Sequence, residues 1–324
     1  MNPFRWFVAG EYGLHYGERT SAGEFVPLGA EAAPPLNYLA ADFPGGWLYA
    51  TARSELCAFD LAEARPRLRF KVPCMGEVAC HLCLSPERRH LFCANYISGN
   101  VAVFRIGDDG FEFTQSMTGR GHCGSNRERQ AGPHAHCCAF IGGNLWTVDL
   151  GQDAIFVYPW DGERLGEELH RIEFPSGTGP RHLVHDPVEN VVYCVSELSC
   201  ELFVIESTAM SIAARRPVAG PGDALSAVRI SPNGKTLGVG IRGADQIAFF
   251  DTATLELQYR LSCGGQCVRD FDFADDETVC ACCQESSSLA VFRRISEEEW
   301  RENQRFDVKK PMCVQFHSGV WAEQ

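Results

Sequence analysis

Residues 179–206 read GPRHLVHDPVENVVYCVSELSCELFVIE, and this stretch contains the unit from which the chain is built. RHLVH, VVYCVS and LFVIE are short runs of alternating or continuous apolar residues, which is typical of β-strands. The dipeptide DP at 186–187 marks a turn after the first run, and the polar segment at 199–201 separates the other two. The stretch therefore predicts a small antiparallel sheet.

The same layout recurs along the chain at a spacing of roughly 40 to 50 residues, which indicates an internal repeat. Each copy follows a first strand and a turn, as in CHLCLSPERR at 80–89, and segments such as FEFTQSM at 111–117 supply a fourth, outer strand. Repeats of four short strands at this spacing are the signature of a β-propeller. Six stretches each contain a second strand, a short polar turn and a third strand: WLYATARSELCAFDL (47–61), LFCANYISGNVAVFRI (91–106), LWTVDLGQDAIFVYPW (145–160), VVYCVSELSCELFVIE (191–206), LGVGIRGADQIAFFD (237–251) and TVCACCQESSSLAVFRR (278–294).

The two ends of the chain supply a seventh unit. PMCVQF at 311–316 matches the first strand PRHLVH at 180–185 but has no successor, whereas RWFVAGEYGLHYGE at 5–18 contains a second and a third strand with no predecessor. Joining them closes the ring and leaves no open sheet edge. We therefore predict an all-β fold in which residues 1–324 form a single domain. It is a seven-bladed β-propeller of four-stranded antiparallel blades, closed by the C-terminal strand joining the N-terminal blade.

Composition limits the possible partners. The chain is 45% hydrophobic and 22% charged, and no apolar run approaches the ~18 residues that cross a bilayer. The first residues lack the pattern of a secretory signal, so we expect a cytoplasmic protein. A net charge of −13 argues against nucleic acid and membrane as partners. A small anion remains a possible ligand, because over a Debye length of ~8 Å a few clustered arginines dominate the local field.

The sixteen cysteines raise the question of a disulfide-rich or zinc-binding protein. Many of them stand inside strand patterns where other repeats have Val, Leu or Ala, so we interpret them as reduced core residues. The CxxC spacing at 80–83 is that of a zinc half-site, but positions i and i+3 of a strand point to opposite faces. We expect neither a metal nor a cofactor. The core cysteines in question are Cys83, Cys93, Cys137, Cys138, Cys194, Cys280 and Cys282.

Superposing the repeats gathers polar residues at one end of the ring. His136, Arg181 and Arg269 align at the start of inner strands, while Glu197 and Arg242 align at the turn after second strands. In a closed propeller these equivalent positions lie on one face, around the mouth of the channel. His134 precedes His136 by two residues, so we expect it to point to the same side.

Five stretches resemble the lactonase family of seven-bladed propellers, typified by the bacterial 6-phosphogluconolactonase and the fungal carboxymuconate cyclase. The resemblance covers nearly the whole chain and implies lactone chemistry. In that family a His, an Arg and a Glu at this rim are implicated in catalysis, and they map to His134 or His136, Arg181 and Glu197. The stretches are SPERRHLFCANYISGNVAVF (85–104), NRERQAGPHAH (126–136), GTGPRHLVHDP (177–187) followed by SEL, SPNGKTLGVGIRGADQIAFF (231–250) and VRDFDFADDETVCACCQ (268–284).

Lactone hydrolysis needs a base that activates water and a positive group where the carbonyl oxygen gains charge. We assign the base to Glu197 or a histidine, with Glu11 as a rival because it aligns with Glu197. Arg181 is expected beside the reacting carbonyl, and Arg242 is expected to bind a phosphate or carboxylate group of the substrate. The predicted catalytic set is His134, His136, Arg181, Glu197 and Arg242.

Substrate-binding roles are predicted for Asn126 and Arg129, because they lie in a long insertion before an inner strand. Arg269 is the third substrate-binding candidate, and we expect the adjacent Asp270 to neutralise it locally. Asn95 and Tyr96 are expected to shape a turn.

The leading hypothesis is a hydrolase that opens a sugar lactone, 6-phosphogluconolactone or a related one, by base-assisted attack of water with arginine stabilisation of the oxyanion. The partner is then a small anionic lactone or sugar acid. Two alternatives stay open: a cyclase that lactonises a muconate with the same residues, and a propeller that only binds a ligand or partner. The sequence predicts neither the identity of the lactone nor the oligomeric state.

Overall fold

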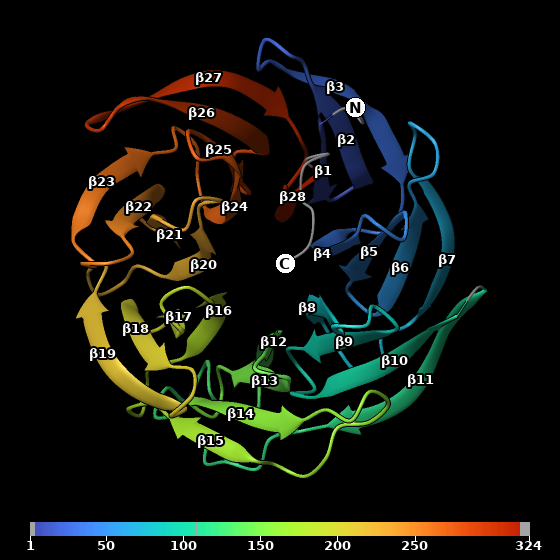
Figure 1. The fold of residues 1–324 in the computed structure, drawn as a ribbon, viewed down its shortest axis with the longest axis vertical. Coiled ribbons are helices and arrows are strands. Elements are labelled where there is room, and N and C mark those ends of the chain that lie inside the picture. The colour runs from blue at the N-terminus through green and yellow to red at the C-terminus, as the bar shows by residue number, and fades with distance from the viewer. Residues whose placement is uncertain (1–3, 108, 318–324) are drawn as a thin grey trace.

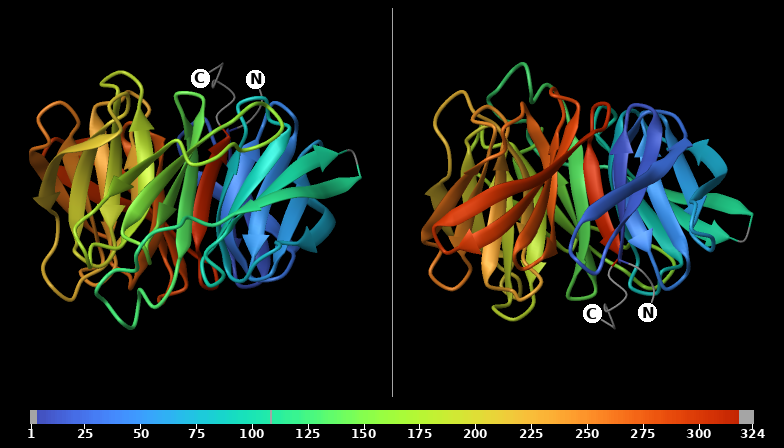
Figure 2. Two further views of the ribbon diagram at one scale, coloured as in Figure 1. Left: turned by 90° about the horizontal axis from the view of Figure 1, so that it is seen from below. Right: turned by 90° about the horizontal axis from the view of Figure 1, so that it is seen from above.

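The computed structural model describes residues 4–107 and 109–317, which form seven four-stranded antiparallel sheets in a ring (Figure 1). The predicted seven-bladed β-propeller is confirmed. In side view the strands cross the thickness of a disc, and the loops lie on its two faces (Figure 2). Within the same residues no helix is long and apolar enough to cross a lipid bilayer.

Every blade has the same strand order from the channel outward. The inner strands are β28 (Cys313–His317), β4 (Leu36–Asp42), β8 (Ala79–Leu84), β12 (Ala135–Ile141), β16 (Pro180–Asp186), β20 (Leu225–Ile230) and β24 (Val268–Asp275). The second strands are β1 (Phe4–Gly10), β5 (Trp47–Ala52), β9 (His90–Asn95), β13 (Asn144–Asp149), β17 (Val191–Ser196), β21 (Thr236–Ile241) and β25 (Thr278–Cys283). The third strands are β2 (Gly13–Arg19), β6 (Glu55–Asp60), β10 (Val101–Gly107), β14 (Ala154–Pro159), β18 (Glu201–Glu206), β22 (Gln246–Asp251) and β26 (Ser288–Ser296). The outer strands are β3 (Phe25–Ala32), β7 (Arg67–Pro73), β11 (Gly110–Met117), β15 (His170–Glu173), β19 (Ser211–Pro217), β23 (Leu257–Ser262) and β27 (Glu299–Asp307).

The core consists of apolar layers between neighbouring blades. The second strands β9 and β25 are buried at every position, because each blade packs both faces against its neighbours. Successive side chains of a strand point to opposite faces, and both faces of these strands are buried. Their sequences are therefore mostly continuous apolar runs. Outer strands such as β7 alternate between exposed and partly buried positions. The sequence pattern therefore follows the distance of each strand from the axis.

The cysteines belong to these layers. All sixteen lie in the described part of the chain and are free thiols, as predicted. Cys280 and Cys282 pack with Trp6 and Val8 between the last and the first blade. Cys83 differs from the expectation, because it is only partly buried.

The first blade is assembled from both ends of the chain. β28 pairs antiparallel with β1, with Val314 opposite Val8 and Phe316 opposite Trp6. Figure 1 shows this red C-terminal strand beside the blue N-terminal strands, on the channel side of the blade. The predicted closure is therefore confirmed in the described residues.

Six of the inner strands carry a β-bulge near the end where they begin. In β16, for example, Pro180 pairs with Ser196 and His182 with the next residue, Val195, which leaves Arg181 as the extra residue. A bulge interrupts the alternation of side chains and re-aims the extra one. The bulged positions are Asn37, Cys80, His136, Arg181, Ser226–Ala227 and Arg269.

Several bulged side chains donate a hydrogen bond to the next blade. Arg181 Nη1 donates to the Ser226 carbonyl at 2.6 Å, and Ser226 Oγ donates to the Val268 carbonyl at 2.7 Å. Asn37 Nδ2 likewise donates to the Ala79 carbonyl at 3.0 Å. These bonds link successive blades around the channel. No such bond joins His136 or Arg269 to a following blade among the described residues.

Deleting residues 311–324, of which 318–324 lie outside the described part, should open the ring. The deletion removes β28 from the first blade and exposes the edge of β1, so we expect a broader thermal transition at lower temperature. Calorimetry or circular dichroism measures it. A synthetic peptide of residues 311–324 should restore the sharp transition, whereas a scrambled peptide should not. Melting of the deletion variant like the intact chain would contradict this closure.

Candidate active site

Glu197 lies at the centre of an arginine cluster, at the end of the channel where the inner strands begin. Its Oε2 is 2.9 Å from Arg181 Nε and 2.6 Å from Arg242 Nη2, and its Oε1 is 2.5 Å from Arg129 Nη2. Glu197 and Arg181 are each only 2% exposed. The structure thus brings together Arg181, Glu197 and Arg242, which the repeats placed at one rim, and adds Arg129 from the insertion.

The arginines determine the protonation state of Glu197. Burial alone would raise the pKa of this carboxyl, but the charges of Arg242 and Arg181 hold it far below its usual range. A carboxylate with so low a pKa is a weak proton acceptor. Glu197 is therefore better suited to holding the arginines in place than to activating water.

Gly179 brings Glu197 to the start of β16. Its carbonyl accepts a hydrogen bond from the Glu197 amide at 2.7 Å. The glycine has a φ of +61°, and a Cβ at this position would lie 2.5 Å from Leu198 Cγ. A side chain is therefore excluded here by both backbone conformation and space.

A buried hydrogen-bond network fixes the insertion that carries Arg129. Gln130 Nε2 donates to Asp153 Oδ1 at 2.7 Å, and Asp153 also accepts the amides of Gly177 at 2.7 Å and Gly179 at 2.6 Å. Asp153 thereby ties the insertion to the segment that leads into β16. These hydrogen bonds hold the insertion beside β16, where Arg129 pairs with Glu197.

Asn126 lies in the insertion, close to the turn that carries Arg129. Its Oδ1 accepts the backbone amides of Glu128 at 3.2 Å and Arg129 at 3.1 Å. The side chain therefore shapes the turn that presents Arg129, and its acceptor atom is already engaged there.

Tyr96 takes part in the site, contrary to the expectation that it only shapes a turn. Its hydroxyl accepts a hydrogen bond from Arg129 Nη2 at 3.2 Å, and its ring stacks on His134 with centroids 4.5 Å apart. His134 Nδ1 lies 2.7 Å from the Tyr96 carbonyl, so this nitrogen carries the proton and donates it. The backbone of His134 is held in turn by Asp149 Oδ1 at 2.9 Å.

His136 lies closer to the charged cluster than His134 does. It is 4% exposed, and its buried Nδ1 has no hydrogen-bond partner among the described residues. Burial and the charge of Arg181 keep the pKa of His136 well below its ordinary value, so the ring is neutral at pH 7. The two histidines do not share one side of a regular strand, because His134 precedes β12 and His136 is its bulged residue.

A cavity of about 160 Å³ opens beside this cluster. Arg181 and Arg269, two bulged residues of the ring, both line it. The other lining residues are Asn37, Tyr38, Val78, Cys80, His182, Asp270 and Met312.

The local neutralisation of Arg269 by Asp270 is not found. Asp270 Oδ1 is instead 2.8 Å from Arg229 Nη2, and its Oδ2 accepts the amide of Val314 at 3.4 Å. The bulge at Arg269 separates the two adjacent side chains, so that Asp270 pairs with Arg229 and Arg269 lines the cavity.

A cluster of rings that was not predicted from the sequence lies deeper in the channel. Tyr38 stacks on His81 with centroids 4.1 Å apart, and His182 lies edge-on to both His81 and His136, at 5.3 Å from each. Burial first, then Arg181, lowers the pKa of His182 far below its ordinary value. Tyr38, His81 and His182 each follow a bulged residue, so aligning the positions after Asn37, Cys80 and Arg181 would have found them.

Glu11, the rival base, lies in the turn between β1 and β2. Its Oε2 is buried without a hydrogen-bond partner among the described residues, and it forms no ion pair with the arginines of the cluster there. In the same part of the chain, no three His, Cys, Asp or Glu side chains come together as metal ligands.

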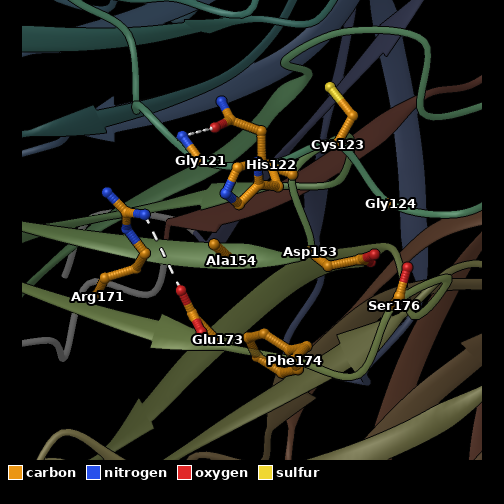
Figure 3. Close-up of a pocket in the computed structure, with 11 residues that line it drawn as sticks. Gly121, His122, Cys123, Gly124, Asp153, Ala154, Arg171, Glu173, Phe174 and Ser176 are labelled. Carbon is orange, nitrogen blue, oxygen red and sulfur yellow. Dashed lines mark hydrogen bonds and ion pairs between the residues drawn. The ribbon is translucent and has the colours of Figure 1, made fainter.

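A second cavity of about 160 Å³ lies between the insertion and the strands β14 and β15, in the blade that begins with β12 (Figure 3). Arg171 at its wall forms ion pairs with Glu168 and Glu173, so its charge is compensated. In Figure 3 this arginine points towards Glu173, and a dashed line at Gly121 marks the hydrogen bond that its amide donates to Gln152 Oε1. None of the predicted catalytic or substrate-binding residues lines this cavity.

Known proteins resemble this chain both in sequence and in fold. A family model described as "Lactonase, 7-bladed beta-propeller" matches residues 13–316. A 6-phosphogluconolactonase of Bacillus subtilis is 31% identical over 261 residues, which cover 74% of each chain. Two solved structures have similar folds: a periplasmic gluconolactonase of Pseudomonas aeruginosa, with a TM-score of 0.87, 24% identity and coverage of 97% and 99%, and a protein from Lactobacillus plantarum, with a TM-score of 0.88, 23% identity and coverage of 98% and 100%.

Replacing Glu197 by Gln should strongly destabilise the fold, because it leaves three arginines without their shared counter-ion. We expect the free energy of unfolding at pH 7, measured in urea, to fall by about 3–5 kcal/mol. Because the folded-state pKa of Glu197 lies below the unfolded value of ~4.3, its stabilisation is present above pH 4.3 and is lost as the pH falls.

Glu201→Gln is the matched control for this prediction. Glu201 pairs at 3.7 Å with Arg215, whose side chain is 54% exposed, so the loss should stay under about 1 kcal/mol. Equal losses for the two variants would show that the arginine cluster does not depend on Glu197.

Proposed function

This chain belongs to the lactonase family of seven-bladed β-propellers and is a lactone-hydrolysing enzyme, and we propose that its substrate is an anionic sugar lactone, with 6-phosphogluconolactone the first to test. The name of the Bacillus subtilis relative supports this choice of substrate. The proposed reaction is attack of water on the lactone carbonyl within the 160 Å³ cavity beside Arg181.

The observation that carries the proposal is the charge at the channel mouth. Four guanidinium groups gather there, and a single carboxylate, Glu197, forms ion pairs with three of them. A group of like charges held in a partly buried cleft raises the local concentration of an oppositely charged ligand, although the whole chain carries a charge of −13. This arrangement favours a substrate with at least one acidic group. The four arginines are Arg129, Arg181, Arg242 and Arg269.

His136 is the proposed general base. It is neutral at pH 7, lies beside Arg181 and makes no structural bond through Nδ1 to the described residues. His134 is less suited to this role, since its Nδ1 is committed to the Tyr96 carbonyl and its ring to the stack on Tyr96.

The proposed steps conserve protons. His136 accepts a proton from water as the oxygen attacks the carbonyl carbon, and the carbonyl oxygen becomes an oxyanion beside Arg181. Collapse of this intermediate breaks the ring C–O bond, and His136 returns the proton to the leaving ring oxygen. The product is the open-chain hydroxy acid. Glu197 and the Ser226 carbonyl keep Arg181 in position throughout.

Purified protein should accelerate the opening of 6-phosphogluconolactone above the spontaneous rate, and that of gluconolactone less. The acid released is followed by titration, with a parallel reaction without enzyme to correct for spontaneous opening. A muconolactone is included because the sequence left the cyclase direction open. No acceleration of any lactone would contradict the proposed function.

His136→Gln should lower kcat/KM by about 10²–10⁴-fold, the usual contribution of a general base. The base acts only when neutral, and burial holds the pKa of His136 below the ordinary value, so the acidic limb of the kcat/KM profile should lie below pH 6.5. This limb should disappear in the variant. His170→Gln, on the outer strand of the same blade, is the control and should leave the rate unchanged. A larger loss in His134→Gln or His182→Gln would assign the base to that residue instead.

A further inference from the structure

Two bulged arginines, Arg181 and Arg269, line the cavity. Arg269 is partly buried, it belongs to β24 of the seventh blade, and it lines the cavity together with Arg181 of the fifth blade. The two guanidinium groups are close enough for the charge of Arg269 to contribute to the lowered pKa of Arg181. The cavity therefore has a positive group on two sides.

Among the described residues, Arg269 has no ion-pair partner for its charge. Arg129, Arg181 and Arg242 all pair with Glu197, and the adjacent Asp270 pairs with Arg229. Within residues 4–107 and 109–317, Arg269 forms no ion pair and no hydrogen bond to the next blade, unlike Arg181 at the equivalent position. A partly desolvated cation without a partner is unfavourable, so this site gains free energy when an anion enters the cavity.

Arg242 was the sequence-based candidate for binding the substrate's acidic group, but its environment differs. Its Nη2 is 2.6 Å from Glu197 Oε2, and it does not belong to the lining of the cavity. An arginine already paired with a buried carboxylate has less to gain from a second anion. Arg269 fits that role better on both geometry and charge.

Resting on the proposed lactonase function, we infer that Arg269 binds the acidic group carried by the lactone, a phosphate or a carboxylate, and so determines the preference for anionic over neutral lactones. The ring ester is the target of Arg181, which lines the same cavity, and of His136, whose ring lies edge-on to His182 in the cavity wall. A guanidinium binds two oxygens of such a group in one plane, which lysine cannot do.

The test compares Arg269→Gln and Arg269→Lys with the intact protein on three lactones. They are 6-phosphogluconolactone, a carboxylated sugar lactone and the neutral gluconolactone. Loss of a hydrogen-bonded charge pair should lower kcat/KM of Arg269→Gln for the anionic lactones by roughly 10- to 100-fold, with less than about a threefold change for the neutral one. Arg269→Lys should lose less. The two anionic lactones decide whether phosphate or carboxylate is the group bound.

Arg301→Gln is the matched control, because Arg301 lies on the outer strand β27 of the same blade and is 67% exposed. It should change none of the rates. Equal losses of Arg269→Gln on the neutral and anionic lactones would overturn the inference and place Arg269 at the reacting carbonyl.

A binding measurement separates this inference from the proposed function. Glucose 6-phosphate, a ring sugar that is not a lactone, should raise the Tm of the intact protein, whereas glucose should not. The shift should be absent in Arg269→Gln, and the unliganded Tm of this variant should be unchanged or higher, since an uncompensated charge has been removed. A lower unliganded Tm with an undiminished shift would show a structural role and overturn the inference. Failure of the intact protein to open any lactone would contradict the proposed function, and the binding measurement would still decide whether Arg269 is an anion site.

Discussion

The candidate active site depends on one buried carboxylate. Glu197 accepts ion pairs from Arg181 of its own blade, Arg242 of the next blade and Arg129 of the insertion. Without it, like charges would be forced together in a partly buried cleft, which costs several kcal/mol per uncompensated ion. Because a single acid serves three arginines, the cluster keeps an excess of positive charge, and this excess is what an anionic substrate can use.

The β-bulges explain how side chains reach the channel. A regular strand would send alternate residues into the layers between blades, where apolar side chains belong. One extra residue near the start of the inner strands frees a position for Asn, Cys, His or Arg at the mouth. At some of these positions the side chain donates a hydrogen bond to the next blade, whereas for His136 and Arg269 the described residues contain no such bond. The same structural device therefore serves both ring stability and the site.

Much of the site was predictable from the repeats, because equivalent positions of a closed ring meet on one face. Arg181, Glu197, Arg242, His136 and Arg269 all occupy such equivalent positions in the repeats. It failed where local backbone geometry decides the direction of a side chain. Asp270 was expected to neutralise Arg269 but pairs with Arg229, and Tyr96 was expected to shape a turn but contacts Arg129 and His134.

The sequence by itself determined the number of blades, the order of strands and the closure through β28, because apolar periodicity and turn residues are local properties that repeat. It also determined which polar residues stand at the rim. Only the tertiary structure decided which arginine keeps a free charge, since ion pairing depends on distances between blades that no local pattern encodes. For Arg269 the decisive fact is that Asp270 pairs with an arginine 41 residues earlier in the chain.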